Sequence, residues 1–152
     1  MVWKPHVTVS AVVQEGNRFL LVEEEIRGQI EYNNPAGHLE DGETLVEAVR
    51  REVREEAARG FEPRSITGIY LWRNPGSNKT FLRVSFYGTA GEPDPDQALD
   101  DGILRTIWRT RDEIASGELR MRSPLVLQSI DDHLQGRNYP LEILTHLPDG
   151  HF

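Results

Sequence analysis

The chain has 152 residues, of which 38% are hydrophobic and 28% charged, and its formal net charge is −8. This length and composition predict one globular domain over residues 1–152. The negative balance argues against a nucleic-acid-binding surface, which is usually basic. The sequence contains no cysteine, which excludes disulfides and thiolate zinc sites. No basic leader or long apolar run is readable near the start, so we expect a cytoplasmic protein without a membrane segment.

The N-terminal part is predicted to begin with a β-hairpin. His6–Val13 alternates and is rich in valine, and Arg18–Glu24 follows after a turn at Gly16 and Asn17. A further short strand is expected over Tyr32–Pro35. These three segments come before the only long helical pattern in this half of the chain.

A helix is predicted to begin after Thr44, because Thr44 and Glu47 have the spacing of a capping box. Apolar side chains form a stripe along one face of this helix, which can pack on a sheet. The stripe consists of Leu45, Val46, Val49, Val53 and Ala57. We expect the helix to continue to about Arg59 and to end at Gly60, since glycine readily adopts the left-handed conformation that ends helices.

The second half of the chain is predicted to add three strands and two helices around an acidic loop, Gly91–Asp101. The strands are expected over Ser65–Trp72, Thr80–Thr89 and Ile103–Arg109. The helices are expected over Thr110–Gly117, capped by Thr110, and from Ser123, with Pro124 in the first turn, to about Gln135. Strands interrupted by one helix and followed by two more indicate an α/β fold with a mixed sheet between helical layers.

Three acidic residues gather on one face of the first predicted helix. Glu52, Glu55 and Glu56 fall within an arc of roughly 100°, because each helical residue advances by about 100°. Like charges this close repel one another, and a bound cation reverses that effect. Carboxylate oxygens are hard ligands that suit Mg²⁺ or Mn²⁺. The alternative is an acidic helix face that is simply solvated.

The segment from Gly37 to Arg59 resembles the Nudix box, G-x5-E-x7-R-E-U-x-E-E-x-G-U with U aliphatic, of the MutT-like Nudix hydrolases. The positions that match are Gly37, Glu43, Arg51, Glu52, Val53, Glu55 and Glu56. Ala58 stands where the family has glycine, and Arg59 stands where it has an aliphatic residue. These two departures concern the end of the helix and leave the acidic residues intact.

The resemblance implies an α/β/α sandwich and a metal-dependent hydrolase that attacks phosphoanhydride bonds with a metal-activated water. The implied ligands of Mg²⁺ or Mn²⁺ are Glu52, Glu55, Glu56 and the carbonyl of Ala36. Glu43 and Arg51 are implied to form an orienting ion pair. Gly37 is expected to let the backbone come close enough to present the Ala36 carbonyl.

Residues outside the box are also candidates for the site. Family members commonly place a further acid just before the strand at Ile103, which points to Asp100 or Asp101 within a loop that also holds Glu92, Asp94 and Asp96. The candidate substrate residues are Tyr32, Trp72 and Phe81 as aromatic contacts, and Arg83 for a distal phosphate. Further candidates are Arg27, Arg73, Lys79 and His38.

Several stretches beyond the box resemble one bacterial branch of the family that contains phosphatases. They are Lys4–Val9, Asn33–Ala48, Phe81–Arg83, Arg122–Val126 and Tyr139–Glu142. This resemblance implies release of phosphate from nucleoside di- and triphosphates or from thiamine-type pyrophosphates. Cleavage of ADP-ribose or another nucleoside-diphosphate sugar is the alternative, and a non-catalytic nucleotide-binding module is a third. The expected partner is a small nucleotide or pyrophosphate, with no nucleic acid and no membrane, and both a monomer and a homodimer stay open.

Overall fold

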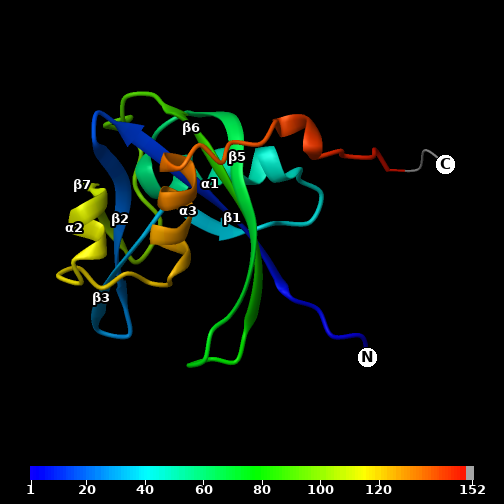
Figure 1. Cartoon of the computed structure of the whole chain (residues 1–152), viewed down its shortest axis with the longest axis horizontal. Helices are drawn as coiled ribbons and strands as arrows, with labels where there is room; N and C mark the ends of the chain where they lie inside the picture. The colour runs from blue at the N-terminus through cyan, green and yellow to red at the C-terminus, as the bar shows by residue number, and fades with distance from the viewer. Residues whose placement is uncertain (150–152) are drawn as a thin grey trace.

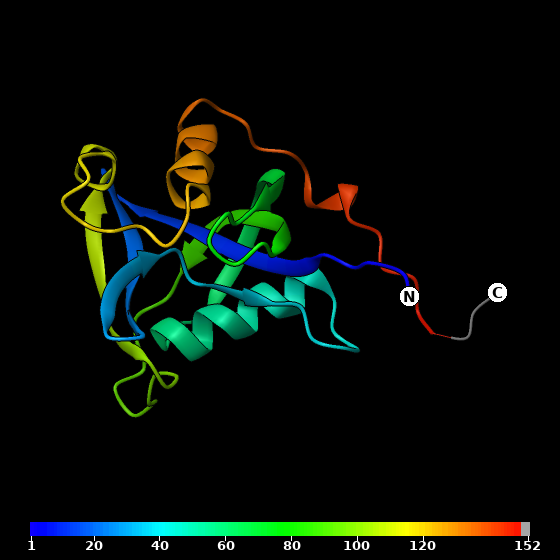
Figure 2. The ribbon, with the colours of Figure 1, turned by 90° about the horizontal axis from the view of Figure 1, so that it is seen from below.

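The computed structural model describes residues 1–149, in which a mixed sheet lies between helices (Figure 1). The strands are β1 (His6–Glu15), β2 (Arg18–Ile26), β3 (Gln29–Asn33), β4 (Ala36–His38), β5 (Phe61–Arg73), β6 (Thr80–Ala90) and β7 (Ile103–Thr110). The helices are α1 (Leu45–Ala57), α2 (Arg111–Ala115) and α3 (Leu125–Leu134), followed by a 3-10 turn, η1 (Leu141–Ile143). Figure 2 shows α1 and α3 on opposite sides of the strands, so the α/β/α sandwich that the resemblance implied is confirmed.

Strand β1 is the centre of the seven-stranded sheet, whose order is β3-β2-β1-β6-β5, with β4 beside β1 and β7 beside β2. β1 pairs with β2 only next to the turn, at Gln14 and Glu15. Along the rest of its length it pairs in parallel with β6 on one side, and antiparallel with β4 on the other side. The expected hairpin therefore forms at its turn and then opens. The opening admits β4, which carries the glycine of the box.

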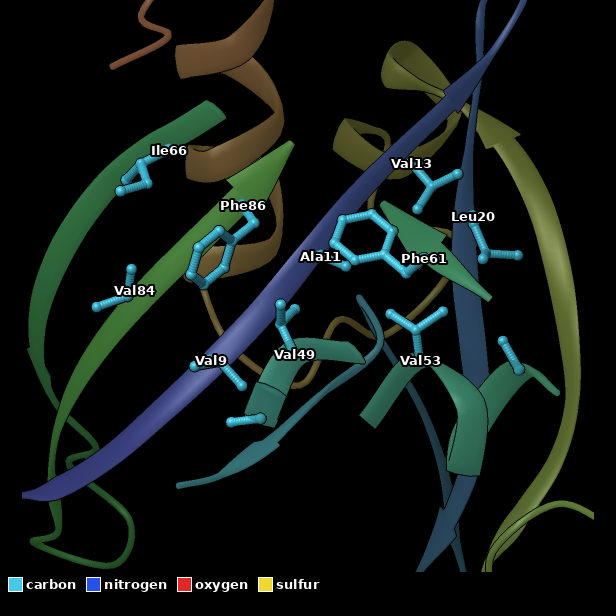
Figure 3. Close-up of a cluster of buried hydrophobic side chains, with 12 residues drawn as sticks. Val9, Ala11, Val13, Leu20, Val49, Val53, Phe61, Ile66, Val84 and Phe86 are labelled. Atoms are coloured by element: carbon cyan, nitrogen blue, oxygen red, sulfur yellow. The ribbon is translucent and has the colours of Figure 1, made fainter. Parts of the chain in front are cut away.

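Alternate residues of β1 and β2 supply two separate hydrophobic clusters, because successive side chains of a strand point to opposite faces of a sheet. The cluster under α1 includes Val9, Ala11, Val13, Leu20, Val49, Val53, Phe61 and Phe86 (Figure 3). The cluster under α2 and α3 includes Val12, Phe19, Leu21, Ile107, Ile114, Val126 and Ile130. The apolar stripe of α1 is thus buried against the sheet, which leaves the neighbouring face of the helix free to carry the acids.

Both ends of α1 are defined by local hydrogen bonds. At the start, Thr44 and Glu47 form the expected capping box. The prediction for the end was wrong, because the helix stops at Ala57, and Ala58 rather than Gly60 adopts the left-handed conformation, with φ of 55°. The carbonyl of Ala58 accepts a bond from Asp94 N–H at 2.7 Å, which draws the chain away from the helix axis towards the acidic loop.

Arg59 also leaves the helix and does not act on its last carbonyls. Its guanidinium donates to the carbonyl of Gly91 at 2.9 Å and lies over the ring of Trp108, 5.3 Å from the ring centroid. Gly60 accepts a backbone bond from Gly91 at 3.0 Å. Tertiary contacts to the segment after β6 therefore decide how the chain leaves α1.

Some predicted boundaries differ from the observed ones. The strand expected over Tyr32–Pro35 is β3, which begins earlier, at Gln29, and ends at Asn33. Its sequence does alternate between polar and apolar residues, but its first two residues, Gln29 and Ile30, are exposed, so the start of the strand is not marked by burial. The short strand β4 was not predicted. β5 begins four residues earlier than expected, and α3 begins at Leu125, not at Ser123.

Candidate active site

A cavity of about 530 Å³ lies beside β4, where the acidic face of α1 meets the opened end of the sheet. Its wall also includes parts of β1, β2 and β6, the residues just before β7, and the segment just before α3. The predicted metal ligands Glu52, Glu55 and Glu56 line this cavity together with Ala36. The fold therefore brings together acidic residues of one helix and the backbone of the box glycine segment.

The acids of α1 differ in how far they are buried. Glu52 and Glu56 are 7% and 8% exposed, whereas Glu55 is partly exposed. The Glu56 carboxyl accepts a hydrogen bond from the backbone N–H of Ala36 at 2.8 Å. The backbone of Glu55 accepts a bond from Asp100 N–H at 3.0 Å. These contacts attach β4 and the acidic loop to the same face of α1.

Gly37 has a role that the sequence reasoning did not include. A Cβ atom added at this position would lie 2.1 Å from Oε1 of Glu52, because the Glu52 carboxyl covers the glycine. Any side chain at this position would therefore force the Glu52 carboxyl to move. The glycine therefore makes room for an acidic side chain, in addition to any effect on the Ala36 carbonyl.

Burial makes these carboxyl groups difficult to ionise. Burial raises the pKa of Glu56 to about 9 and that of Glu52 to about 7, and it also raises the pKa of Glu55. Nearby acids, including Asp100, act in the same direction. A cation among these carboxyl groups would favour their charged forms, so the donor set fits a hard divalent ion. This fit concerns the kind of donor and not the present arrangement, because Arg51 is bonded to Glu52 and Glu55 and, among residues 1–149, no three acidic side chains are arranged to hold a metal ion.

Arg51 occupies the centre of the acidic face. It forms a two-pronged ion pair with Glu43, with Nη2 at 2.7 Å and Nε at 3.0 Å. Its Nη1 donates to Glu52 at 2.7 Å and to Glu55 at 3.2 Å, and Nη2 also donates to the carbonyl of His38 at 2.9 Å. The hydrogen bonds from Arg51 lower the pKa of Glu43. Arg51 therefore connects α1, β4 and the loop between them in one hydrogen-bond network.

The acidic loop contributes Asp100 and Asp101 to the cavity wall. Glu92, Asp94 and Asp96 are not part of that wall, and Asp94 instead accepts a bond from the N–H of Asp96 at 2.9 Å. Asp100 and Asp101 were predicted from their position just before β7. The structure places both of them beside the predicted metal ligands.

Several cavity residues were missed by the sequence reasoning, among them Thr8, Glu24, Asn33 and Arg122. Glu24 is 7% exposed and forms a short ion pair with Nη1 of Arg122. Its charge also raises the pKa of Glu56. Glu24 lies in a run of three glutamates on β2, and neither spacing nor motif separates it from its neighbours. Its ion pair with Arg122, on the segment before α3, is visible only in the tertiary structure.

The candidate substrate residues fall into two groups. Phe81, Arg83 and His38 line the cavity. Tyr32, on β3, does not, because it is buried in the cluster under α2 and α3 and its hydroxyl donates to Glu23 at 2.7 Å. Trp72 lies behind Phe81, with the two rings stacked at 6.0 Å between centroids. The other basic candidates are outside the cavity wall and exposed: Arg27, Arg73 and Lys79.

Arg83 is 8% exposed, and burial lowers its pKa to about 10. The guanidinium therefore stays charged at neutral pH. Its Nε donates to the hydroxyl of Thr8 at 3.1 Å. The cavity thus holds a buried cation as well as buried acids.

The family model of the NUDIX domain matches residues 4–129, and the chain belongs to this family. It is 41% identical over 142 residues to the phosphatase NudJ of Escherichia coli strain K12, covering 93% of this chain and 92% of the relative. A solved NUDIX hydrolase from Nitrosomonas europaea is 46% identical, with a TM-score of 0.92 over 97% of this chain and 100% of that one. An ADP-ribose pyrophosphatase from Streptococcus suis, 15% identical with a TM-score of 0.67, covers 90% of this chain and 96% of that one, and shares the fold alone.

The chain is therefore a Nudix hydrolase, an enzyme that cleaves phosphoanhydride bonds. Nudix hydrolases generally act on small nucleotides and use divalent metal ions. No helix among residues 1–149 has the length and apolar character needed to cross a membrane.

Proposed function

We propose that this enzyme releases phosphate from nucleoside di- and triphosphates or from thiamine-type pyrophosphates, with Mg²⁺ or Mn²⁺ as its cofactor. The observation that carries the proposal is a single cavity that has buried acids on one side and the buried cation Arg83 on the other. The similarity to a relative named as a phosphatase supports the same reading.

Each part of the cavity has a distinct role in the proposal. The metal would be held by Glu52, Glu55, Glu56 and the carbonyl of Ala36. When bound, it supplies positive charge to the phosphates and lowers the pKa of a coordinated water. Arg51 and Glu43 hold α1 against the loop between β4 and α1. Arg51 donates to Glu43 in that loop, to Glu52 on α1 and to the carbonyl of His38 on β4. The charged Arg83 attracts the phosphate chain.

The acids near the opening contribute to the movement of protons. The charge of Asp100 raises the pKa of Glu52, Glu55 and Glu56, and its backbone N–H donates to the carbonyl of Glu55. Asp100 is exposed to solvent at the edge of the cavity. We assign to Asp100 the further acidic role that the sequence left open between Asp100 and Asp101.

The test is a panel of substrates assayed in Mg²⁺, in Mn²⁺ and in a chelator, with every product identified. Inorganic phosphate from nucleotides or from thiamine pyrophosphate supports the proposal. AMP and ribose phosphate from ADP-ribose, at higher kcat/KM than any nucleotide, would instead establish the pyrophosphatase alternative. Equal rates in Mg²⁺ and in chelator would remove the metal from the proposal, and no hydrolysis of any compound would leave the binding-module reading.

A further inference from the structure

Arg83 lacks the partners that a buried arginine normally has. Its Nη1 atom is buried and has no hydrogen-bond partner among residues 1–149. Within the same part of the chain it takes part in no salt bridge. An ionised group without a partner is costly to bury. Such a group is retained where a ligand supplies the missing charge.

The nearby acids are bonded to other groups and form no hydrogen bond or salt bridge with Arg83 among residues 1–149, although the charges of Glu24 and Glu56 favour its charged form. Glu24 is already bonded to Arg122, and Glu52 is already bonded to Arg51. The carboxyl of Glu56 accepts a bond from Ala36. Thr8 holds Nε of Arg83 and leaves Nη1 free. The Nη1 atom of Arg83 can therefore donate a hydrogen bond to one anionic oxygen of a ligand in the cavity.

The pairing of the strands determines the order in which the residues around Arg83 follow one another along β1. Thr8 is paired with Arg83 on β6 and with His38 on β4. Two residues further along β1, Ser10 is paired with Ser85 and with Ala36, the neighbour of Glu56. Residues paired in this way point to the same face of a sheet. We call the residues paired at Thr8 the Arg83 row and those paired at Ser10 the Ala36 row. The two rows are consecutive on one face of the sheet.

In the other direction along β1, His6 is paired with Phe81, which is paired with Trp72 on β5. The rings of His6, His38 and Phe81 lie within 5.2 to 6.4 Å of one another, measured between centroids. Each step of two residues along a strand covers about 7 Å. Along this line the cavity wall contains Phe81 of the aromatic row (His6, Phe81 and Trp72), then Thr8, Arg83 and His38 of the Arg83 row, then Ala36 of the Ala36 row.

Burial increases along the same line. His6 and Phe81 are partly exposed, Thr8 and Arg83 are 2% and 8% exposed, and Ser10 is fully buried. The aromatic row thus forms the outer end of this wall. A ligand that enters past it reaches the guanidinium before it reaches the backbone beside Glu56.

We propose that, in a nucleoside diphosphate or a thiamine-type pyrophosphate, Arg83 binds the phosphate nearest to the ring of the substrate, so that the outer phosphate is the one attacked. The ring rests on the aromatic row, and a pentose or a short alkyl linker spans the gap to Arg83. This inference rests on the proposed function and adds to it the orientation of the substrate and the phosphorus that reacts.

The reaction in this orientation is a displacement at the outer phosphorus. A water oxygen forms a bond to that phosphorus, and the bond from it to the bridging oxygen breaks. The bridging oxygen leaves with the electron pair on the ring-bearing phosphate, and the proton lost by water passes to solvent. Arg83 stabilises the negative charge that gathers on this leaving phosphate.

The first experiment follows the oxygen atom. A nucleoside diphosphate gives the same two products whichever phosphorus is attacked, but in water enriched in oxygen-18 the label reports the attacked atom. We expect the label in inorganic phosphate, measured by mass spectrometry of both products. Label in the nucleoside monophosphate would overturn the inference while leaving the hydrolase function in place.

The second experiment measures binding without turnover. A nucleoside monophosphate, titrated calorimetrically into metal-free protein, is expected to bind wild type at least about tenfold more tightly than Arg83→Met, since one charge-assisted bond is lost. Arg83→Lys should bind with intermediate strength. Equal binding by wild type and Arg83→Met, or no binding by wild type, would overturn the inference even if no substrate were hydrolysed.

Thr8 is a positioning residue in this scheme, and it supplies a matched pair of variants. Thr8→Val removes the hydroxyl that holds Nε of Arg83, whereas Thr8→Ser keeps it. Thr8→Val should raise KM for the nucleoside diphosphate several-fold, and Thr8→Ser should restore the wild-type value. If Thr8→Ser is as impaired as Thr8→Val while both remain folded by circular dichroism, the hydroxyl does not position Arg83.

Discussion

Arg51 and Arg83 line the same cavity, yet their surroundings are opposite. Arg51 donates to Glu43, Glu52 and Glu55 and to one backbone carbonyl. Arg83 donates through Nε to Thr8, and its Nη1 has no partner among residues 1–149. Arg51 is thus fully paired with acids of the chain, whereas Arg83 has no acidic partner among residues 1–149.

The difference separates a structural arginine from a ligand-binding one. Arg51 satisfies its charge within the protein, so its loss should damage the frame of the site. Arg83 has a charge that the protein does not satisfy, so its loss should affect ligands more than folding. Both side chains are cations in the wall of one cavity, and what distinguishes them is whether their hydrogen-bond donors have partners within the protein.

The largest expected effect concerns the acidic side. Glu56→Gln keeps the size of the side chain and its bond to Ala36 but removes a charge from the predicted metal site, so kcat should fall at least about 100-fold in saturating Mg²⁺. Steady-state kinetics provide the measurement, and Glu62→Gln, an exposed change on β5, is the control. Near-normal turnover of Glu56→Gln would show that α1 is not the metal site.

A direct comparison of the two arginines comes next. Arg51→Ala should lower both activity and the free energy of unfolding, the latter by about 2–3 kcal/mol, because it leaves several carboxyl groups without their donor. Arg83→Met should leave the free energy of unfolding unchanged or raise it, because a buried unpaired charge disappears. Urea unfolding of both variants checks this contrast. Equal destabilisation by the two changes would remove the distinction.

The ion pair within the acidic side can be tested by a double-mutant cycle. Glu43→Gln should give a milder defect than Arg51→Ala, since Arg51 also holds Glu52 and Glu55. The double variant should be no worse in activity or stability than Arg51→Ala alone. Fully additive losses would indicate that the two residues act independently.

The raised pKa values of Glu52 and Glu56 predict how the stability of the metal-free protein depends on pH. The folded protein keeps protons on Glu52 and Glu56 up to about pH 7 and 9, whereas the unfolded chain releases them near its ordinary glutamate pKa of 4.5. The folded state therefore binds more protons between these values, and stability falls as pH rises, by up to about 1.4 kcal/mol per pH unit for each proton.

Thermal unfolding at pH 6 and at pH 8.5 measures this effect. In chelator, Tm should fall more from the lower to the higher pH in wild type than in Glu56→Gln, which lacks the titrating group. Saturating Mg²⁺ should reduce the fall, because a metal binds the deprotonated ligands. The expectation fails if the metal-free wild type and Glu56→Gln show the same change with pH.

The smallest expected effect concerns the end of the helix that carries the acidic face. Ala58 has φ of 55°, a conformation that glycine adopts without steric cost. Ala58→Gly should raise the free energy of unfolding by about 0.5–1 kcal/mol, measured in urea. Ala57→Gly, the matched change within the helix, should lower it by a similar amount. A loss of stability in Ala58→Gly would mean that the packing of the Ala58 methyl group outweighs the backbone strain.

The sequence by itself determined the parts that depend on local spacing. The period of Val49, Val53 and Ala57 determined which face of α1 is buried, and the acids one step away followed from it. The capping box at Thr44 and Glu47 needs only residues three apart, and it formed as expected. The fold class, the box and the position of Asp100 before β7 were therefore readable without coordinates.

Only the tertiary structure decided features that depend on distant segments. The end of α1 at Ala57 depends on the acidic loop, because Asp94 bonds to Ala58 across 36 positions of sequence. Glu24 lines the cavity and is paired there with Arg122, and Tyr32 is withdrawn from it by Glu23. The incomplete bonding of Arg83 is also a tertiary fact, since a missing partner is visible only when every neighbouring strand is in place.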